Sequence, residues 1–429
     1  MQKNYTRPEV LAPAGTLEKL KVAFDYGADA VFIGGQAYGL RSRAGNFSFE
    51  DMAEGVAYAQ AHGGKLYVAA NMVTHEGNEE GAGEWFRTLR DIGIHAVIVS
   101  DPALIAVCAA EAPGLPIHLS TQASATNYET LEFWRQLGLE RVVLAREVSM
   151  EELAEIRKHT DVEIEAFVHG AMCISYSGRC VLSNYMSLRD ANRGGCSQSC
   201  RWKYDLYDMP FGERKSVTGS VEEPFSMSAV DMSMIEHIPD MIENGVNSLK
   251  IEGRMKSIHY VSTVSMVYKK AVDAYLESPE TFEAIKPELV DELWKVAQRE
   301  LDTGFYYGTP DENKQLFGAR RKIPQYKFIG EVVSYDAEAG TATVRQRNVI
   351  TEGDAIEFYG PGFRHFETKI QNLRLAETGE RVDRAPNPME LLLIDVPQAV
   401  EPGDMIRKAE EKRLAAPAVK KEELTVVKA

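Results

Sequence analysis

Residues 9–35 read EVLAPAGTLEKLKVAFDYGADAVFIGG, and this stretch sets a pattern that repeats through the first 255 residues. Two apolar runs, EVLAPAG (9–15) and AVFIGG (30–35), flank a segment whose apolar residues recur at helical spacing. Six similar runs follow: LYVAAN (66–71), AVIVSD (96–101), IHLSTQA (117–123), RVVLARE (141–147), EIEAFVHG (163–170) and SLKIEG (248–253). Runs that do not alternate with polar residues are typical of parallel strands buried on both faces. Eight of them, separated by helices, predict an α/β fold of the closed (β/α)8 TIM-type barrel class.

A large insertion follows the seventh predicted strand, over residues 171–247. Active sites of such barrels form at the carboxyl ends of the strands, so the insertion should lie at that mouth. With it, the barrel domain is predicted to span residues 1–320. From about residue 327 short alternating strands and two Gly-Asp corners predict a small C-terminal β-barrel over 327–408. Residues 409–429 are charged, and we expect a flexible tail there.

Four of the five cysteines lie within 28 residues, at Cys173, Cys180, Cys196 and Cys200. Their spacing, C-x6-C-x15-C-x3-C, predicts a bound metal or an iron–sulfur cluster on residues 173–200, with zinc and unliganded thiols as alternatives. Disulfides are disfavoured because MQKNYTRPEV has no signal-peptide core, which predicts a cytoplasmic protein with reduced thiols. Cys108 lies in the apolar run ALIAVCAA and reads as a buried, inert thiol.

Composition is that of a globular protein, with 44% hydrophobic and 26% charged residues. No apolar stretch approaches the roughly 20 residues that span a bilayer, so no membrane partner is expected. The net charge of −16 repels nucleic acid at long range, and RNA binding would therefore need a local basic surface. One candidate surface follows the cysteines and carries Arg179, Arg189, Arg193, Arg201 and Lys203; a merely solvated loop is the alternative.

Polar side chains end several predicted strands, where they can converge on the mouth of the barrel. They are Asn71, Asp101, Thr121, Gln122, Arg146, Glu147, His169, Lys250, Glu252 and Arg254. His169 is the best single candidate because it ends a strand four residues before Cys173, although a structural histidine would fit the pattern as well. Any of the others could be a cap or an ion pair.

Two adjoining segments carry a family resemblance: EAFVHGAMC (165–173) and GRCVLS (178–183). Together they resemble the signature of the collagenase-like peptidase family U32. PEVLAPAG (8–15), GADAVFIGG (27–35), LSTQASATN (119–127) and SLKIEGRMKS (248–257) are similar to the same family. The C-terminal extension resembles that of the longer subgroup, the tRNA hydroxylation proteins.

The resemblance implies hydroxylation of the wobble uridine of tRNA to 5-hydroxyuridine, dependent on prephenate and independent of oxygen. It implies a 4Fe-4S cluster on the signature residues Cys173 and Cys180, with Cys196 and Cys200 as the remaining pair. The implied partners are the tRNA anticodon arm, prephenate and a second protein of the same family. Glu165, His169 and Glu252 are the candidate catalytic residues. The candidate clamps for the carboxylates of prephenate are Arg146, Lys250 and Arg254, because basic side chains bind such groups strongly.

Other activities stay open at this point. The family name records peptidases, but the motif arranges no nucleophile with a base, and the sequence contains no H-E-x-x-H helix. A cluster-bearing scaffold is a further alternative, as is a hydroxylase subunit for a small aromatic such as a quinone precursor or for ribosomal RNA.

Overall fold

The computed structural model describes residues 5–40, 46–208, 213–215, 225–311, 314–316 and 326–409. All of the predicted tail after Ala409 lies outside these ranges. The chain divides into two compact units, one of Met1–Ile323 with Gly360–Arg364 and one of Pro324–Tyr359 with His365–Ala429.

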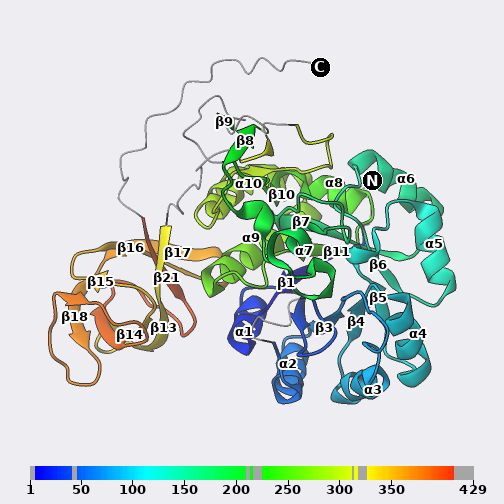
Figure 1. The fold of residues 1–429 in the computed structure, drawn as a ribbon. Coiled ribbons are helices and arrows are strands. Elements are labelled where there is room, and N and C mark those ends of the chain that lie inside the picture. Colours follow the sequence, from blue (N-terminus) through cyan, green and yellow to red (C-terminus); the bar gives the residue numbers. More distant parts are fainter. Residues whose placement is uncertain are drawn as a thin grey trace. The chain divides into compact units, whose positions relative to one another are not determined.

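Eight parallel strands of the described residues form a closed barrel in the first unit (Figure 1). They are β1 (Glu9–Pro13), β2 (Ala30–Gly34), β3 (Lys65–Ala70), β4 (Ala96–Val99), β5 (Ile117–Leu119), β6 (Arg141–Val143), β7 (Glu163–Ala171) and β11 (Ser248–Ile251). Strands β1 to β7 pair in chain order, and β11 pairs with both β1 and β7, which closes the ring. The predicted TIM-type barrel is confirmed, and its eight strands start within one residue of the eight apolar runs.

Helices cover the outside of this ring. They are α1 (Leu17–Asp25), α2 (Phe49–Ala61), α3 (Ala82–Ile92), α4 (Pro102–Glu111), α5 (Tyr128–Gln136), α6 (Met150–His159), α8 (Ile238–Glu243), α9 (Ile258–Glu277) and α10 (Pro279–Trp294). Local sequence fixes several starts: Ser149 and Glu152 form a capping box at α6, and the Asp101 carboxylate caps α4. No helix of the described ranges is long and apolar enough to cross a membrane.

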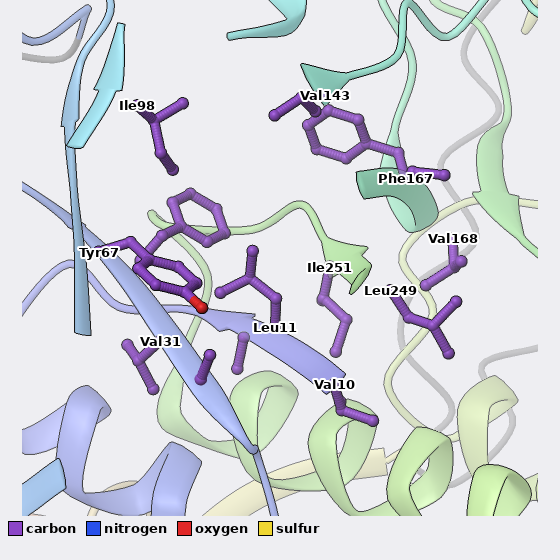
Figure 2. Close-up of a cluster of buried hydrophobic side chains, with 14 of the residues drawn as sticks. Val10, Leu11, Val31, Tyr67, Ile98, Val143, Phe167, Val168, Leu249 and Ile251 are labelled. Atoms are coloured by element: carbon purple, nitrogen blue, oxygen red, sulfur yellow. The ribbon is translucent and has the colours of Figure 1, made fainter. Parts of the chain in front are cut away.

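The barrel core is apolar toward the helices and mixed inside the ring. Leu11, Tyr67 and Ile98 are among the side chains drawn in Figure 2, and all three are buried. Val10 and Leu249 lie on the other face of their strands and are also fully buried. Burial of both strand faces accounts for the unbroken apolar runs of the sequence.

The described residues of the insertion after β7 form short elements. Its elements are α7 (Leu182–Ser187), the 3-10 turns η2 (Ala191–Arg193), η3 (Ser199–Arg201) and η4 (Ile235–His237), and the strands β8 (Leu206–Asp208), β9 (Glu213–Lys215) and β10 (Asp231–Ser233). Strand β10 pairs antiparallel with the end of β7 and parallel with β12 (Leu301–Asp302). The insertion thereby extends the barrel sheet at the carboxyl end of β7.

The second unit is an antiparallel half-barrel in its described residues, as the alternating pattern predicted (Figure 1). Its seven-stranded sheet has the order β17-β16-β21-β13-β14-β20-β18, and β15 pairs with β19. The strands are β13 (Tyr326–Asp336), β14 (Thr341–Gln346), β15 (Ile350–Thr351), β16 (Ala355–Gly360), β17 (Arg364–Lys369), β18 (Gln371–Leu375), β19 (Arg384–Ala385), β20 (Leu391–Asp395) and β21 (Met405–Ala409).

Candidate functional site

The first part of the insertion is fastened to the loops after β5 and β6. The backbone N–H of Ser177 donates to Glu147 Oε1 at 2.9 Å, and its hydroxyl donates to Oε2 at 3.0 Å. The Ser124 hydroxyl donates to the Ser177 carbonyl, and Arg179 Nε donates to Ser124 at 3.3 Å. Four hydrogen bonds therefore hold the segment between Cys173 and Cys180 against two strand ends.

Two glycines of the signature permit this close approach. Gly170 (φ +107°) and Gly178 (φ +74°) both have left-handed backbones, which other residues rarely adopt. A Cβ at Gly170 would overlap the backbone carbonyl of Glu252, and one at Gly178 would overlap the carbonyl of Gln122. Both positions need glycine for space as well as for conformation, which gives a physical reason for the glycines of the motif.

The later part of the insertion reaches the loop after β3. Asn192 Nδ2 donates to the Cys180 carbonyl at 3.1 Å, and the Asn192 carbonyl accepts from Val73 N–H at 2.9 Å. Arg193 also donates to Asn78 Oδ1 at 2.8 Å. The cysteine-bearing segment thus lies over the carboxyl ends of β3, β5 and β6, as its position in the sequence predicted.

The four clustered thiols lie near enough to influence one another. None of the five cysteines, all of them in described residues, forms a disulfide. Burial raises the pKa of Cys200, and the charges of Cys173, Cys196 and Cys180 raise it further, against the opposing effect of Arg201. Cys173 is exposed at the surface, and desolvation by the surrounding protein raises its pKa, while Arg146 and Arg201 oppose the shift.

This arrangement can be compared with what each metal requires. Tetrahedral zinc needs four sulfurs about 2.3 Å from a single point. Within the residues that the structure describes, no three or more His, Cys, Asp or Glu side chains gather tightly enough around one ion. In a 4Fe-4S cluster each thiolate binds a different iron, so its ligands stand further apart. Four cysteine thiols with Arg146 and Arg201 near them offer the sulfur ligands that either metal group requires.

Arg146 and Glu252 lie beside Cys173. An Arg146 nitrogen is 3.6 Å from Glu252 Oε2, and the guanidinium lies 3.7 Å from the ring centre of Phe167. Glu252 contributes to the raised pKa of Cys173, whereas Arg146 opposes it. These two predicted residues are therefore brought together with the thiols at the mouth of the barrel.

His169 is buried against α9. Its Nδ1 lies 3.3 Å from the Tyr268 hydroxyl, which donates to the Val168 carbonyl at 2.8 Å, and its ring faces Tyr260. Burial lowers the pKa of His169 to about 4, so the imidazole is neutral near pH 7. The position fits the structural alternative considered for this histidine.

Glu165 and Lys250 lie inside the barrel wall. Lys250 Nζ is 2.5 Å from Glu165 Oε1, and both side chains are buried. The Arg141 guanidinium is 3.4 Å from Glu165 Oε2 and also pairs with Glu9 and Glu163. Lys250 is the third of the four residues of β11, and its ammonium group pairs with Glu165.

Arg254 is buried at the mouth, on the side of β1 and β2. Its guanidinium donates to Asn46 at 2.8 Å and occupies the space where a Cβ of Gly34 would lie. A Cβ on Gly15 would likewise meet the Arg254 carbonyl. Packing against Arg254 gives a physical reason for the glycine that ends β2 and the one that follows β1.

Three charged residues near this site were not predicted from the sequence. Arg299 pairs with Asp231 at 2.6 Å, and Lys256 Nζ donates to Gln298 at 3.0 Å. Burial lowers the pKa of both Arg201 and Lys256, and Arg299 lowers each further. Lys256 falls within SLKIEGRMKS and could have been noticed there, whereas nothing in the sequence pattern singles out Asp231 or Arg299.

The predicted basic residues and Cys108 differ in how far they are exposed to solvent. Arg179, Arg193 and Lys203 are exposed, whereas Arg189 and Arg201 are only partly exposed, so the basic surface is smaller than predicted. Cys108 is fully buried, as predicted, and burial raises its pKa to about 12.

A peptidase site finds no support in the serines near His169. Ser177 hydrogen-bonds Glu147, and Ser183 accepts a hydrogen bond from Ser197. Among the described contacts, neither Ser177 nor Ser183 is paired with His169.

Comparison with known proteins agrees with this picture. The sequence profile of peptidase family U32 matches residues 15–316, and that of the U32 C-terminal domain matches residues 324–407. The chain belongs to peptidase family U32. This U32 chain is 49% identical over 402 residues to tRNA hydroxylation protein P1 of Bacillus subtilis (strain 168), covering 94% of this chain and 95% of the relative.

Two Escherichia coli (strain K12) proteins are also similar to this U32 chain. Its tRNA hydroxylation protein P is 33% identical over 438 residues, covering 92% of this chain and 95% of the relative. Its 23S rRNA 5-hydroxycytidine C2501 synthase is 36% identical over 271 residues, covering 63% of this chain and 40% of the relative. The names of all three relatives concern hydroxylation of RNA or its product.

Proposed function

We propose that this chain is an RNA-hydroxylating enzyme that converts the wobble uridine of tRNA to 5-hydroxyuridine, without molecular oxygen and with prephenate as co-substrate. One observation carries the proposal: four cysteines gather over a barrel mouth in a chain whose near-full-length relatives are named tRNA hydroxylation proteins. The name of a third relative, a ribosomal RNA hydroxycytidine synthase, supports hydroxylation as the chemistry.

A 4Fe-4S cluster on Cys173, Cys180, Cys196 and Cys200 would supply the electron transfer that ordinary side chains cannot provide. Arg146 and Arg201 lie beside these thiols and would stabilise their negative charge. The hydrogen bonds of Ser177 and Asn192 keep the cysteine-bearing segment in place.

Arg146 is the residue best placed to bind a carboxylate of prephenate. Its guanidinium is held by Phe167 and Glu252 close to Cys173, and a planar guanidinium binds a carboxylate through two hydrogen bonds. Glu252, of the three candidate catalytic residues, is the one at the mouth. Glu165 and His169 are buried in contacts within the protein, which favours structural roles for both.

The cofactor and the substrate are tested separately. Protein purified without oxygen should contain about four irons per chain, and Cys173→Ala should lose them, whereas Cys108→Ala should keep them. One zinc per chain and no iron would contradict the cluster.

The substrate is tested by a nucleoside profile of tRNA from cells that lack this gene and any parallel oxygen-dependent hydroxylase. We expect 5-hydroxyuridine to disappear and to return with the intact gene. A loss of hydroxycytidine from ribosomal RNA instead would keep the chemistry and replace the substrate.

A further inference from the structure

The short helix α7 has its polar and apolar sides reversed. Ser183 is buried, whereas Tyr185 is 83% exposed and Leu188, which caps the helix, is 94% exposed. Met186 is also exposed. A surface helix of a globular protein normally turns its apolar residues toward the core. The reversal places large apolar side chains in water at an energetic cost, and exposed apolar patches mark interaction sites.

Serine hydroxyls fix this orientation. Ser197 donates to Ser183 Oγ from its backbone N–H and from its hydroxyl, both at 3.2 Å, and Ser187 donates to Ser197 at 2.9 Å. Ser183 and Ser199 Oγ atoms lie 3.5 Å apart, which ties α7 to η3. The serines on the inner face of α7 are thus held by hydrogen bonds, and rotation of Tyr185 inward would break them.

The backbone at the end of α7 is a second, independent indication that the orientation of the helix is fixed. Leu188 has a left-handed backbone (φ 54°), which is uncommon for a residue other than glycine, and its N–H donates to the Asn184 carbonyl at 3.1 Å. Backbone strain of this kind gathers at functional sites. Trp202 directly follows η3, is 41% exposed, and precedes the exposed Lys203.

The charge of the cysteine-bearing segment indicates what kind of ligand the exposed side chains of α7 and η3 bind. Residues 173–203 contain five basic residues and one acidic residue, in a chain whose net charge is −16. Arg193 and Lys203 of this stretch are exposed, and Lys203 directly follows the exposed Trp202. Aromatic rings beside cations suit unpaired nucleotides, whose bases stack on the rings while their phosphates meet the cations. A fully paired stem offers the phosphates but no accessible base faces.

We propose that Tyr185, Met186, Leu188 and Trp202, here called the α7 platform, bind unpaired RNA bases beside the cysteine-bearing segment, with the rings of Tyr185 and Trp202 stacking on the bases and the two aliphatic side chains extending the apolar surface. The inference rests on the proposed RNA substrate and identifies the part of it that the insertion grips: the single-stranded loop of a hairpin. The platform then presents a splayed-out nucleotide near the barrel mouth, where the four cysteines lie.

The test measures binding of an unmodified anticodon stem-loop and of a duplex with the same stem to the full chain. Tyr185→Ala and Trp202→Ala should each weaken hairpin binding roughly 5- to 150-fold and change duplex binding little. Tyr185→Phe should bind normally, because stacking needs the ring and not the hydroxyl. Phe133→Ala is the matched control, since Phe133 is 55% exposed on α5, outside the insertion.

The salt dependence separates stacking from charge. Tyr185→Ala should keep the wild-type slope of affinity against salt, whereas Arg193→Glu should reduce it. Equal hairpin affinity of wild type, Tyr185→Ala and Trp202→Ala would overturn the platform, as would a wild-type protein that binds hairpin and duplex alike. A change of oligomeric state in Tyr185→Ala with unchanged RNA binding would assign the surface to a second copy of the chain. In each of these cases the nucleoside profile would still decide the proposed function by itself.

Discussion

Glu165→Gln is the change that best separates a structural role from a catalytic one. It removes the carboxylate that lies 2.5 Å from Lys250 Nζ and 3.4 Å from the Arg141 guanidinium. Arg141 keeps its ion pairs with Glu9 and Glu163. Lys250 is left buried beside the rings of Phe32 and Phe167, at 4.5 and 5.5 Å, which do not replace a carboxylate.

The expected cost follows from that burial. Removal of one partner of a buried ion pair destabilises a protein by about 3–5 kcal/mol, because the other charge stays buried and uncompensated. Replacement of both partners by apolar residues of similar size is often neutral or stabilising. We therefore expect Glu165→Gln to lower the free energy of unfolding by about 3–5 kcal/mol, and Glu165→Met with Lys250→Met to restore most of it.

Urea unfolding followed by tryptophan fluorescence measures this in the full chain, because Trp85, Trp134, Trp202 and Trp294 all belong to the barrel unit. Glu155→Gln is the control: Glu155 pairs with Lys158 on the exposed surface, and no measurable change is expected. Unchanged stability of Glu165→Gln together with lost hydroxylation would refute the structural role and return Glu165 to the catalytic residues.

Two further predictions concern the barrel and its insertion. Burial lowers the pKa of His118 to about 3. As the pH falls below about 6.5, the unfolded chain therefore binds a proton at this histidine while the folded chain does not. Stability should fall by roughly 2 kcal/mol from this group by pH 5, and His118→Phe should flatten the urea-midpoint profile between pH 6.5 and 5; an equally steep profile would contradict it. Gly178→Ala should detach the cysteine-bearing segment and lower iron content, whereas Gly63→Ala, with a similar left-handed backbone but open space around it, should cost only about 1 kcal/mol in urea unfolding and keep the iron. Equal iron content in both alanine variants would show that the Gln122 carbonyl does not require glycine at 178.

The sequence predicted the barrel well because each of its strands is buried on both faces and therefore appears as an apolar run. The partners of Lys250 do not follow from this pattern, since a bulge between Lys250 and Ile251 and a partner 85 residues away decide its surroundings. The position of the four clustered cysteines at the barrel mouth could be predicted from their place in the sequence after the seventh strand. The reversed orientation of α7 could not, because it depends on hydroxyl pairs such as Ser183 with Ser197, which no periodicity reveals.

The central claim joins the four cysteines to hydroxylation of tRNA, and one measurement tests that link directly. It is the amount of 5-hydroxyuridine in tRNA from cells that lack this gene and any parallel hydroxylase, complemented with wild type, Cys173→Ala or Cys108→Ala. We predict normal 5-hydroxyuridine with wild type and Cys108→Ala, and none with Cys173→Ala at equal protein level. Normal 5-hydroxyuridine with Cys173→Ala would contradict the claim.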